Sequence, residues 1–326
     1  MSVYAVAVLL LYALAAGWGA DRLLSRARWV SRHPRQALLV WHASAVACLG
    51  ALTGVSLLLA HDVLEHALLW LLHADKSRLH LAYAGGRNID GLWNAAALLP
   101  IIVTTSMLAV VTSKAIADER RRRQFRLLPR TSERFGYSSG AVDVGVAVVN
   151  DAVPAAHCLP GRHGHGLIIL TSATLANLTR TEVGAVLEHE RAHLHLHHHR
   201  MILIADSVAA ILARTGALRS YPDQVRRLVE LEADDVAARR FGTSTVASAL
   251  LTMCTPPPRT ACDAHGLSFS ASAVAVRIRR LIESGDGTRR LRTTPRVLLT
   301  WSVPLALLLP PAIVLWPAAF LVGSAH

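Results

Sequence analysis

Long apolar stretches alternate with polar connectors and divide the chain into membrane-like and soluble parts. Four stretches carry no charged side chain, and they cover residues 3–20, 37–60, 95–113 and 297–323. A helix needs roughly 20 apolar residues to cross about 30 Å of hydrocarbon, and all four stretches are close to or above that length. The pattern predicts four transmembrane helices: three in a membrane domain over residues 1–113, and one in residues 297–326, ahead of a short tail.

The connector between the third and fourth apolar stretches, residues 114–296, has the pattern of a soluble α+β domain. Residues 142–150 alternate and are rich in β-branched side chains, residues 155–159 form a short apolar run, and residues 167–171 form a β-type run. These features predict three strands. The fold class expected for the whole chain is α+β, with four transmembrane helices and a soluble domain inserted between the third and the fourth.

Helix signals follow the predicted strands. Thr179 and Glu182 form a capping-box signature at the start of a helix that the pattern extends past His199 without a break. A second helix is predicted from Ser220, with a proline at an early helical position, to Gly242, a residue typical of helix ends.

The placement of basic residues predicts how the chain is oriented in the membrane. The chain has 34 Lys and Arg against 22 Asp and Glu, a net charge of +12, which fits a nucleic-acid-binding protein or a membrane protein equally well. The basic residues cluster after the first and third spans and before the fourth: Arg22, Arg26, Arg28, Arg32 and Arg35; Lys114, Arg120 to Arg123, Arg126 and Arg130; Arg289, Arg290, Arg292 and Arg296. The positive-inside rule then predicts a multi-pass protein of the cytoplasmic membrane, with residues 114–296 in the cytoplasm and both termini outside. Beside a membrane these charges are expected to face the anionic leaflet, and no nucleic-acid binding is expected.

The segment His189-Glu190-Arg191-Ala192-His193 carries the candidate chemistry. Positions four apart lie on one helix face, so both imidazoles can reach one zinc ion. Glu190 lies beside that face, able to take a proton from a water molecule whose pKa zinc lowers toward about 7. This is the metalloprotease interpretation of the motif. The alternative is a surface helix with a metal-avid run of histidines.

Two residues are candidates for a third ligand. His199 stands ten residues after His189, but a ligand at that offset needs a glycine at the position of Leu196 to break the helix. The other candidate lies in Glu230-Leu231-Glu232-Ala233-Asp234, where Glu230 and Asp234 are four apart. One of these two carboxylates can bind zinc while the other accepts the free ring N–H of a ligating histidine. A solvated acidic face is the alternative for this segment.

The His-Glu-Arg-Ala-His motif followed 37 residues later by Glu-Leu-Glu-Ala-Asp resembles the gluzincin membrane proteases related to CAAX prenyl endopeptidases. Three spans, a cytoplasmic zinc domain and a fourth span resemble the BlaR/MecR-type antirepressor metalloproteases. The resemblance implies one zinc ion per chain, held by His189, His193 and Glu230, with Glu190 as general base and Asp234 behind the ligands. It also implies an edge strand, Leu167, Ile168, Ile169, Leu170 and Thr171, that pairs with the substrate backbone.

The chain departs from the β-lactam sensors of that group in one respect. It ends at His326, so the extracellular penicillin-binding domain is expected to be missing. The sequence therefore predicts a membrane-anchored zinc endopeptidase that cleaves a cytoplasmic protein, such as a winged-helix transcriptional repressor in a signalling pathway. The alternatives are a constitutive quality-control protease acting on membrane proteins and a non-catalytic His-rich metal-binding receptor.

Overall fold

The computed structural model of the chain describes residues 2–59, 144–160, 166–254 and 264–285, with isolated residues between 105 and 120 and at 312. The chain divides into two compact units. The first unit holds residues 1–114, 203–225 and 295–326, and the second holds residues 115–202 and 226–294. Residues 203–225, which lie inside the predicted soluble segment, thus group with the N-terminal helices.

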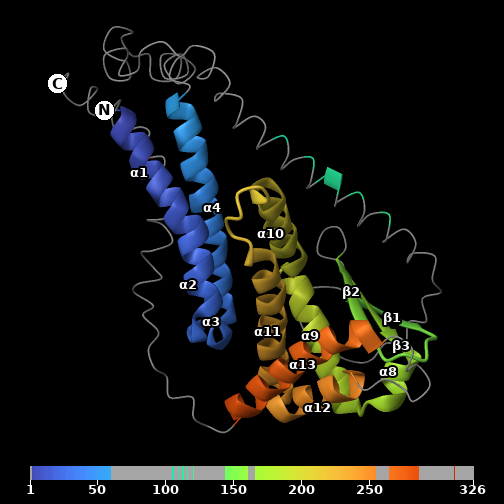
Figure 1. The fold of residues 1–326 in the computed structure, drawn as a ribbon. Coiled ribbons are helices and arrows are strands. Elements are labelled where there is room, and N and C mark those ends of the chain that lie inside the picture. The colour runs from blue at the N-terminus through green and yellow to red at the C-terminus, as the bar shows by residue number, and fades with distance from the viewer. Residues whose placement is uncertain are drawn as a thin grey trace, which may run out of the picture. The chain divides into compact units, whose positions relative to one another are not determined.

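The first unit begins with a run of helices (Figure 1). They are α1 (Ser2–Leu14), the π-helical turn η1 (Ala15–Gly19), α2 (Ala20–Arg26), α3 (Arg28–Arg32) and α4 (Pro34–Leu59). Within the described residues, the stretches Tyr4–Arg26 and Pro34–Ser56 are each long and apolar enough to cross a membrane. The third and fourth predicted spans, 95–113 and 297–323, lie outside the continuously described residues.

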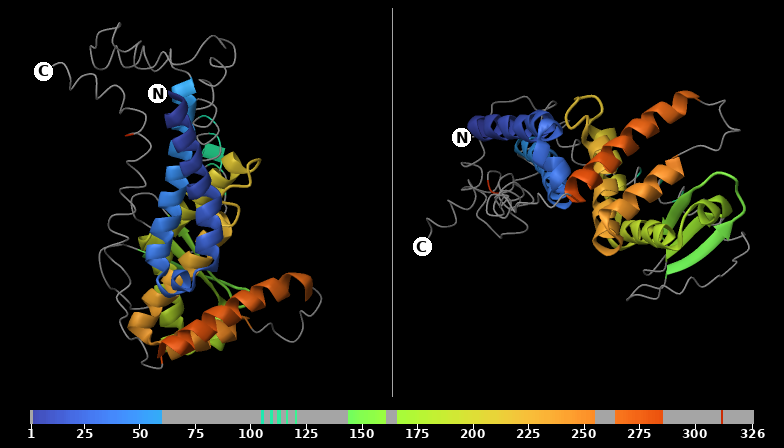
Figure 2. Two further views of the ribbon diagram at one scale, coloured as in Figure 1. Left: turned by 60° about the vertical axis from the view of Figure 1, so that its left-hand side comes forward. Right: turned by 90° about the horizontal axis from the view of Figure 1, so that it is seen from below.

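Close packing joins α1, η1 and α4 in the first unit, and α1 and α4 run side by side in both views of Figure 2. Particular contacts tie residues 203–225 to these helices. A Cβ atom at Gly17 would lie 3.0 Å from the Cβ of Ala217, so glycine permits this approach. The indole of Trp41 stacks on the ring of Tyr221 with centroids 5.8 Å apart. Asp21 accepts hydrogen bonds from the backbone N and the Oγ of Ser220, at 3.0 and 2.6 Å.

The second unit contains the three predicted strands as β1 (Val144–Val149), β2 (Ala156–Pro160) and β3 (Gly166–Thr171). The order is β1-β3-β2, with β1 parallel and β2 antiparallel to β3. The prediction that residues 167–171 form an edge strand is therefore wrong, because β3 pairs on both sides. Its side chains are buried between sheet and helices: Ile168 and Leu170 belong to one core cluster with Val186 and Leu187. Such a strand has no free backbone groups with which to bind a substrate.

Helices α8 to α13 follow the strands in the described residues (Figure 1). They are α8 (Ser172–Asn177), α9 (Arg180–His195), α10 (His198–Leu212), α11 (Tyr221–Phe241), α12 (Thr243–Cys254) and α13 (Ala264–Gly285). The capping box at the start of α9 is confirmed, because the Thr179 hydroxyl accepts from the backbone N of Glu182 and the Glu182 carboxylate accepts from the backbone N of Thr179. Gly242, with φ +86°, ends α11 as the pattern predicts.

The predicted continuous helix through the histidine-rich segment is wrong. The chain leaves the helix at Leu196, passes through His197 with φ +54° and starts α10 at His198. Histidine enters this left-handed region more readily than most residues, so no glycine is needed for the break. The break turns the chain so that Leu194 and His198 are both buried on the inner side.

Candidate metal centre

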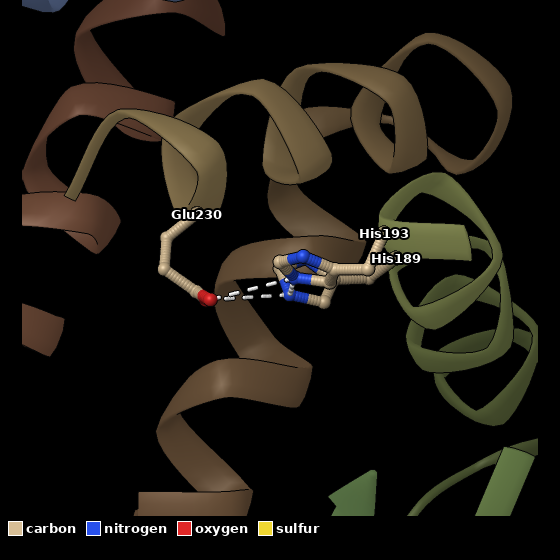
Figure 3. Close-up of side chains that lie close together, drawn as sticks. All are labelled: His189, His193 and Glu230. Atoms are coloured by element: carbon tan, nitrogen blue, oxygen red, sulfur yellow. Dashed lines mark hydrogen bonds and ion pairs between the residues drawn. The ribbon is translucent and has the colours of Figure 1, made fainter. Parts of the chain in front are cut away.

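Two histidines of α9 form one side of the candidate site (Figure 3). His189 and His193 are one helical turn apart, and their Nε2 atoms lie 3.1 Å from each other. Both side chains are largely buried, with 13% and 14% exposed. The sequence therefore predicted correctly that the two rings share one face of a helix.

Glu230 of α11 supplies the third donor from the opposite side (Figure 3). Its Oε2 lies 3.4 Å from Nε2 of His189, and its Oε1 lies 3.4 Å from Nε2 of His193. One atom from each of the three residues lies within 4.8 Å of the others, and no other such group of His, Cys, Asp or Glu occurs among the described residues. Two imidazoles and one carboxylate are the donors of a catalytic zinc site, which leaves a position for water or substrate. The residues present therefore fit zinc.

Asp234 and Arg277 stand behind His189 and Glu230. Asp234, 1% exposed, lies 3.1 Å from Nδ1 of His189, the nitrogen that faces away from the metal position. Arg277 of α13 donates to both oxygens of Asp234, at 2.8 and 2.7 Å, and lies 3.0 Å from Glu230. The sequence pointed to Asp234 through its spacing from Glu230, whereas no motif singled out Arg277.

His193 is supported by a residue that the sequence did not single out. Nδ1 of His198 lies 2.9 Å from Nδ1 of His193, and Nε2 of His198 lies 3.4 Å from Glu232. His198 is 1% exposed and Glu232 is 7% exposed. When Nε2 of His193 binds a metal, its Nδ1 carries the hydrogen and donates to His198. The helix break at His197 brings His198 to this position, so a continuous-helix pattern could not reveal it.

Charges in the site shift the pKa values of the two ligand histidines in opposite directions. Burial lowers the pKa of His189, but hydrogen bonds to Asp234 and Glu230 outweigh it and raise the pKa to about 9. Burial and the neighbouring His189 lower the pKa of His193 to about 3. Burial would raise the pKa of Glu230, but the hydrogen bond to His189 and the surrounding positive charges lower it to about 2. The site thus favours an ionised carboxylate, as metal binding requires.

Glu190 faces the strand β2. The thiol of Cys158 donates a hydrogen bond to its carboxylate, and His157 lies near enough to affect it electrostatically. Burial raises the pKa of Glu190, opposed by the charge of His189 and the bond from Cys158. Burial and the Glu190 carboxylate raise the pKa of Cys158, so the thiol stays protonated. A carboxyl with a raised pKa is suited to take up a proton and release it again.

These residues line one cavity of about 590 Å³ in the second unit. His189, Glu190, His193 and Glu230 lie on one part of its wall, and residues 154–158 and 160 of the β2 region on another. Within the described residues β2 pairs only with β3, so its other edge is free beside the cavity. The remaining wall is largely apolar and includes Leu194, Ile202, Val246, Leu250, Met253 and Val274.

The other histidines of the segment do not join the donor group among the described residues. His199 lines the cavity but stands outside the group of three, so of the two candidates for the third ligand the structure brings Glu230, and not His199, to the histidine pair. His195 and His197 are exposed.

A comparison with protein families agrees with this geometry. The sequence model of peptidase family M48 matches residues 118–283, just over half of the chain. The match includes every residue of the candidate metal centre, from Cys158 to Arg277. No curated protein and no solved structure matches the chain. The chain belongs to peptidase family M48, whose members are metal-dependent, usually zinc-dependent, peptidases.

Proposed function

We propose that this M48 peptidase is a membrane-anchored zinc endopeptidase that hydrolyses a cytoplasmic protein. The observation that carries the proposal is the convergence of His189, His193 and Glu230 from two helices, with Glu190 on the wall of the same cavity. In this proposal the first three residues hold one zinc ion. The convergence supports an enzyme over a His-rich metal-handling receptor, because the exposed His195 and His197 take no part in it.

Zinc in this site supplies Lewis-acid chemistry, which polarises the peptide carbonyl and makes a water molecule more acidic. The residues of the chain move the proton. The carboxylate of Glu190 takes a proton from the attacking water and delivers it to the nitrogen of the scissile amide, which leaves as the amine of the second product. Asp234 accepts from Nδ1 of His189 and keeps that ring in the tautomer whose Nε2 is free for the metal.

The free edge of β2 and the apolar cavity wall support an extended peptide substrate. A substrate strand can add to β2 through backbone hydrogen bonds, and the apolar part of the wall can take up an apolar side chain. We assign to β2 the substrate-binding role that the sequence resemblance implied for residues 167–171.

The two N-terminal apolar stretches Tyr4–Arg26 and Pro34–Ser56 support the membrane anchor, because their length and composition suit a membrane span. We extend it to four spans with the peptidase domain in the cytoplasm, because the basic residues follow the first and third apolar stretches. A cytoplasmic domain at the membrane favours a BlaR/MecR-like role, with a transcriptional repressor as substrate.

The test compares Glu190→Gln with Glu188→Gln in the full-length protein purified in detergent. Glu188 lies on the same helix but pairs with Arg240 at 2.9 Å, away from the donor group. We expect Glu190→Gln to lower the rate of protein hydrolysis by about 10²–10⁴-fold while one zinc per chain is retained. Glu188→Gln should hydrolyse at the wild-type rate. Hydrolysis undiminished in Glu190→Gln would refute the peptidase assignment of these residues.

The substrate is identified by comparing protein lifetimes in cells that carry wild-type or Glu190→Gln protein. A cytoplasmic DNA-binding protein stabilised by the substitution would support the repressor. If only membrane proteins were stabilised, the repressor would be excluded as the substrate and a quality-control role would take its place.

A further inference from the structure

We infer that Arg277 is a positioning residue. It holds one oxygen of Glu230, so that only the other oxygen binds the metal. The inference rests on the proposed zinc site and concerns how its third ligand is held. Arg277 lies on α13, more than forty residues after Glu230, and belongs to neither of the two motifs.

The two oxygens of Glu230 have different neighbours. Nη1 of Arg277 lies 3.0 Å from Oε2, closer than either histidine nitrogen lies to this carboxylate. Each oxygen also lies 3.4 Å from one ring nitrogen, Oε1 from Nε2 of His193 and Oε2 from Nε2 of His189. The contact with Arg277 is therefore what distinguishes the two oxygens. Because a guanidinium N–H lies against Oε2 and not against Oε1, Oε1 is the oxygen left for a cation between the histidines.

The orientation of the guanidinium is set by Asp234. Nε and Nη2 of Arg277 donate to the two oxygens of Asp234 in a bidentate pair. This pair fixes the plane of the guanidinium. The remaining nitrogen, Nη1, then points at Glu230. The side chain of Arg277 is only 15% exposed and that of Asp234 1%, so water competes little for these bonds.

This restraint matters for a site with three protein ligands. Such a site needs one position open to water and substrate. A carboxylate that bound through both oxygens would occupy an additional position and crowd the open one. With Oε2 held by Arg277, Glu230 binds through Oε1 alone.

The chain offers a matched control on the same two helices. Arg280, one turn after Arg277, makes a bidentate pair with Asp235 at 2.9 and 2.8 Å. Its exposure of 13% resembles that of Arg277. Among the described residues, neither Arg280 nor Asp235 lines the cavity or belongs to the donor group.

The experiment measures zinc affinity by competition with a chromogenic chelator, in the full-length protein with Arg277→Gln, Arg277→Lys or Arg280→Gln. We expect Arg277→Gln to weaken zinc binding by about 10–100-fold, and Arg280→Gln to leave it unchanged. Arg277→Lys should fall between the two, because an ammonium keeps the charge but cannot hold Asp234 and Glu230 in one plane. Wild-type affinity in both Arg277 variants would overturn the inference.

Zinc X-ray absorption supplies a second readout. The wild type should show one carboxylate oxygen on zinc, and Arg277→Lys should show an increased oxygen count. Two oxygens of Glu230 on zinc in the wild type would overturn the inference. If Arg277→Gln does not fold, Arg277→Lys still decides the question through both measurements. Wild-type protein that bound no zinc would instead refute the proposed function.

Discussion

The two units of the molecule bury polar side chains in different ways. In the first unit several of these groups bond to their own helix: Ser44, Ser56 and Ser207 each donate to the carbonyl oxygen four residues earlier, as does Nδ1 of His42. The pair of Asp21 with Ser220 is an exception to this pattern. In the second unit they bond across elements. Arg277 pairs with Asp234 and Arg280 pairs with Asp235, in both cases from another helix.

The difference agrees with the function proposed for each unit. A helix that crosses a membrane must satisfy its polar groups internally, because lipid offers no hydrogen-bond partners. A metal centre instead needs charged groups held at one point, and each buried charge then needs a counter-charge from another element. Replacing a buried polar side chain should therefore lower the free energy of unfolding much more in the second unit than in the first.

The largest effect is expected for Asp234→Ala. The substitution leaves Arg277 buried without its bidentate partner and removes the acceptor beside His189. We expect the free energy of unfolding of the metal-free protein to fall by about 3–5 kcal/mol, measured by urea unfolding. Asp235→Ala, which removes the partner of Arg280 at a more exposed position, is the control and should cost less. Equal losses of unfolding free energy would show that the Arg277–Asp234 pair stabilises the fold no more than the Arg280–Asp235 pair.

A smaller effect is expected from pH. The pKa of His193 in the folded protein is lowered from 6.5 to about 3, so protonation favours the unfolded chain as pH falls below 6.5. The pKa of Glu230 is lowered from 4.5 to about 2, so its stabilisation is also lost in acid. The raised pKa of His189 acts oppositely: its stabilisation is complete below 6.5 and is lost as pH rises through about 9.

We therefore expect the metal-free protein to lose on the order of 2 kcal/mol of stability between pH 7 and pH 4, by urea unfolding. Stability that is constant over this range would contradict the charges assigned to the site.

The support of His193 is tested by His198→Ala against His199→Ala. His198 is buried against His193, whereas His199 lines the cavity outside the donor group. We expect His198→Ala to weaken zinc binding by about 10-fold, and His199→Ala to leave it unchanged, by chelator competition. The reverse order would return His199 to consideration as a ligand.

The smallest effect is expected in the first unit. The hydroxyl of Tyr221 is buried, and it has no hydrogen-bond partner among the described residues. Tyr221→Phe keeps the stacking on Trp41 and removes only this oxygen, so the thermal unfolding temperature should change little or rise. A large decrease would show that this hydroxyl stabilises the first unit through a bond to another element.

Local features of the site were predictable from sequence. The four-residue spacing of His189 and His193 requires only a helix, and Thr179 with Glu182 marked where that helix begins. Gly242 marked the end of α11, the helix that carries Glu230 and Asp234. The separation of Glu230 from Asp234 by one turn likewise places both on one face, where Glu230 lies beside Nε2 of His189 and Asp234 lies beside Nδ1 of the same ring.

The tertiary structure alone decided which elements meet. The order β1-β3-β2 put β2, and not residues 167–171, at the edge beside Glu190, because strand neighbours depend on packing and not on local propensity. The break at His197 turned His198 inward, although no glycine or proline marks it. Arg277 reached Asp234 and Glu230 from α13 through contacts that no spacing encodes. Periodicity along one helix determines a face of that helix, whereas a metal centre built from three helices depends on long-range packing.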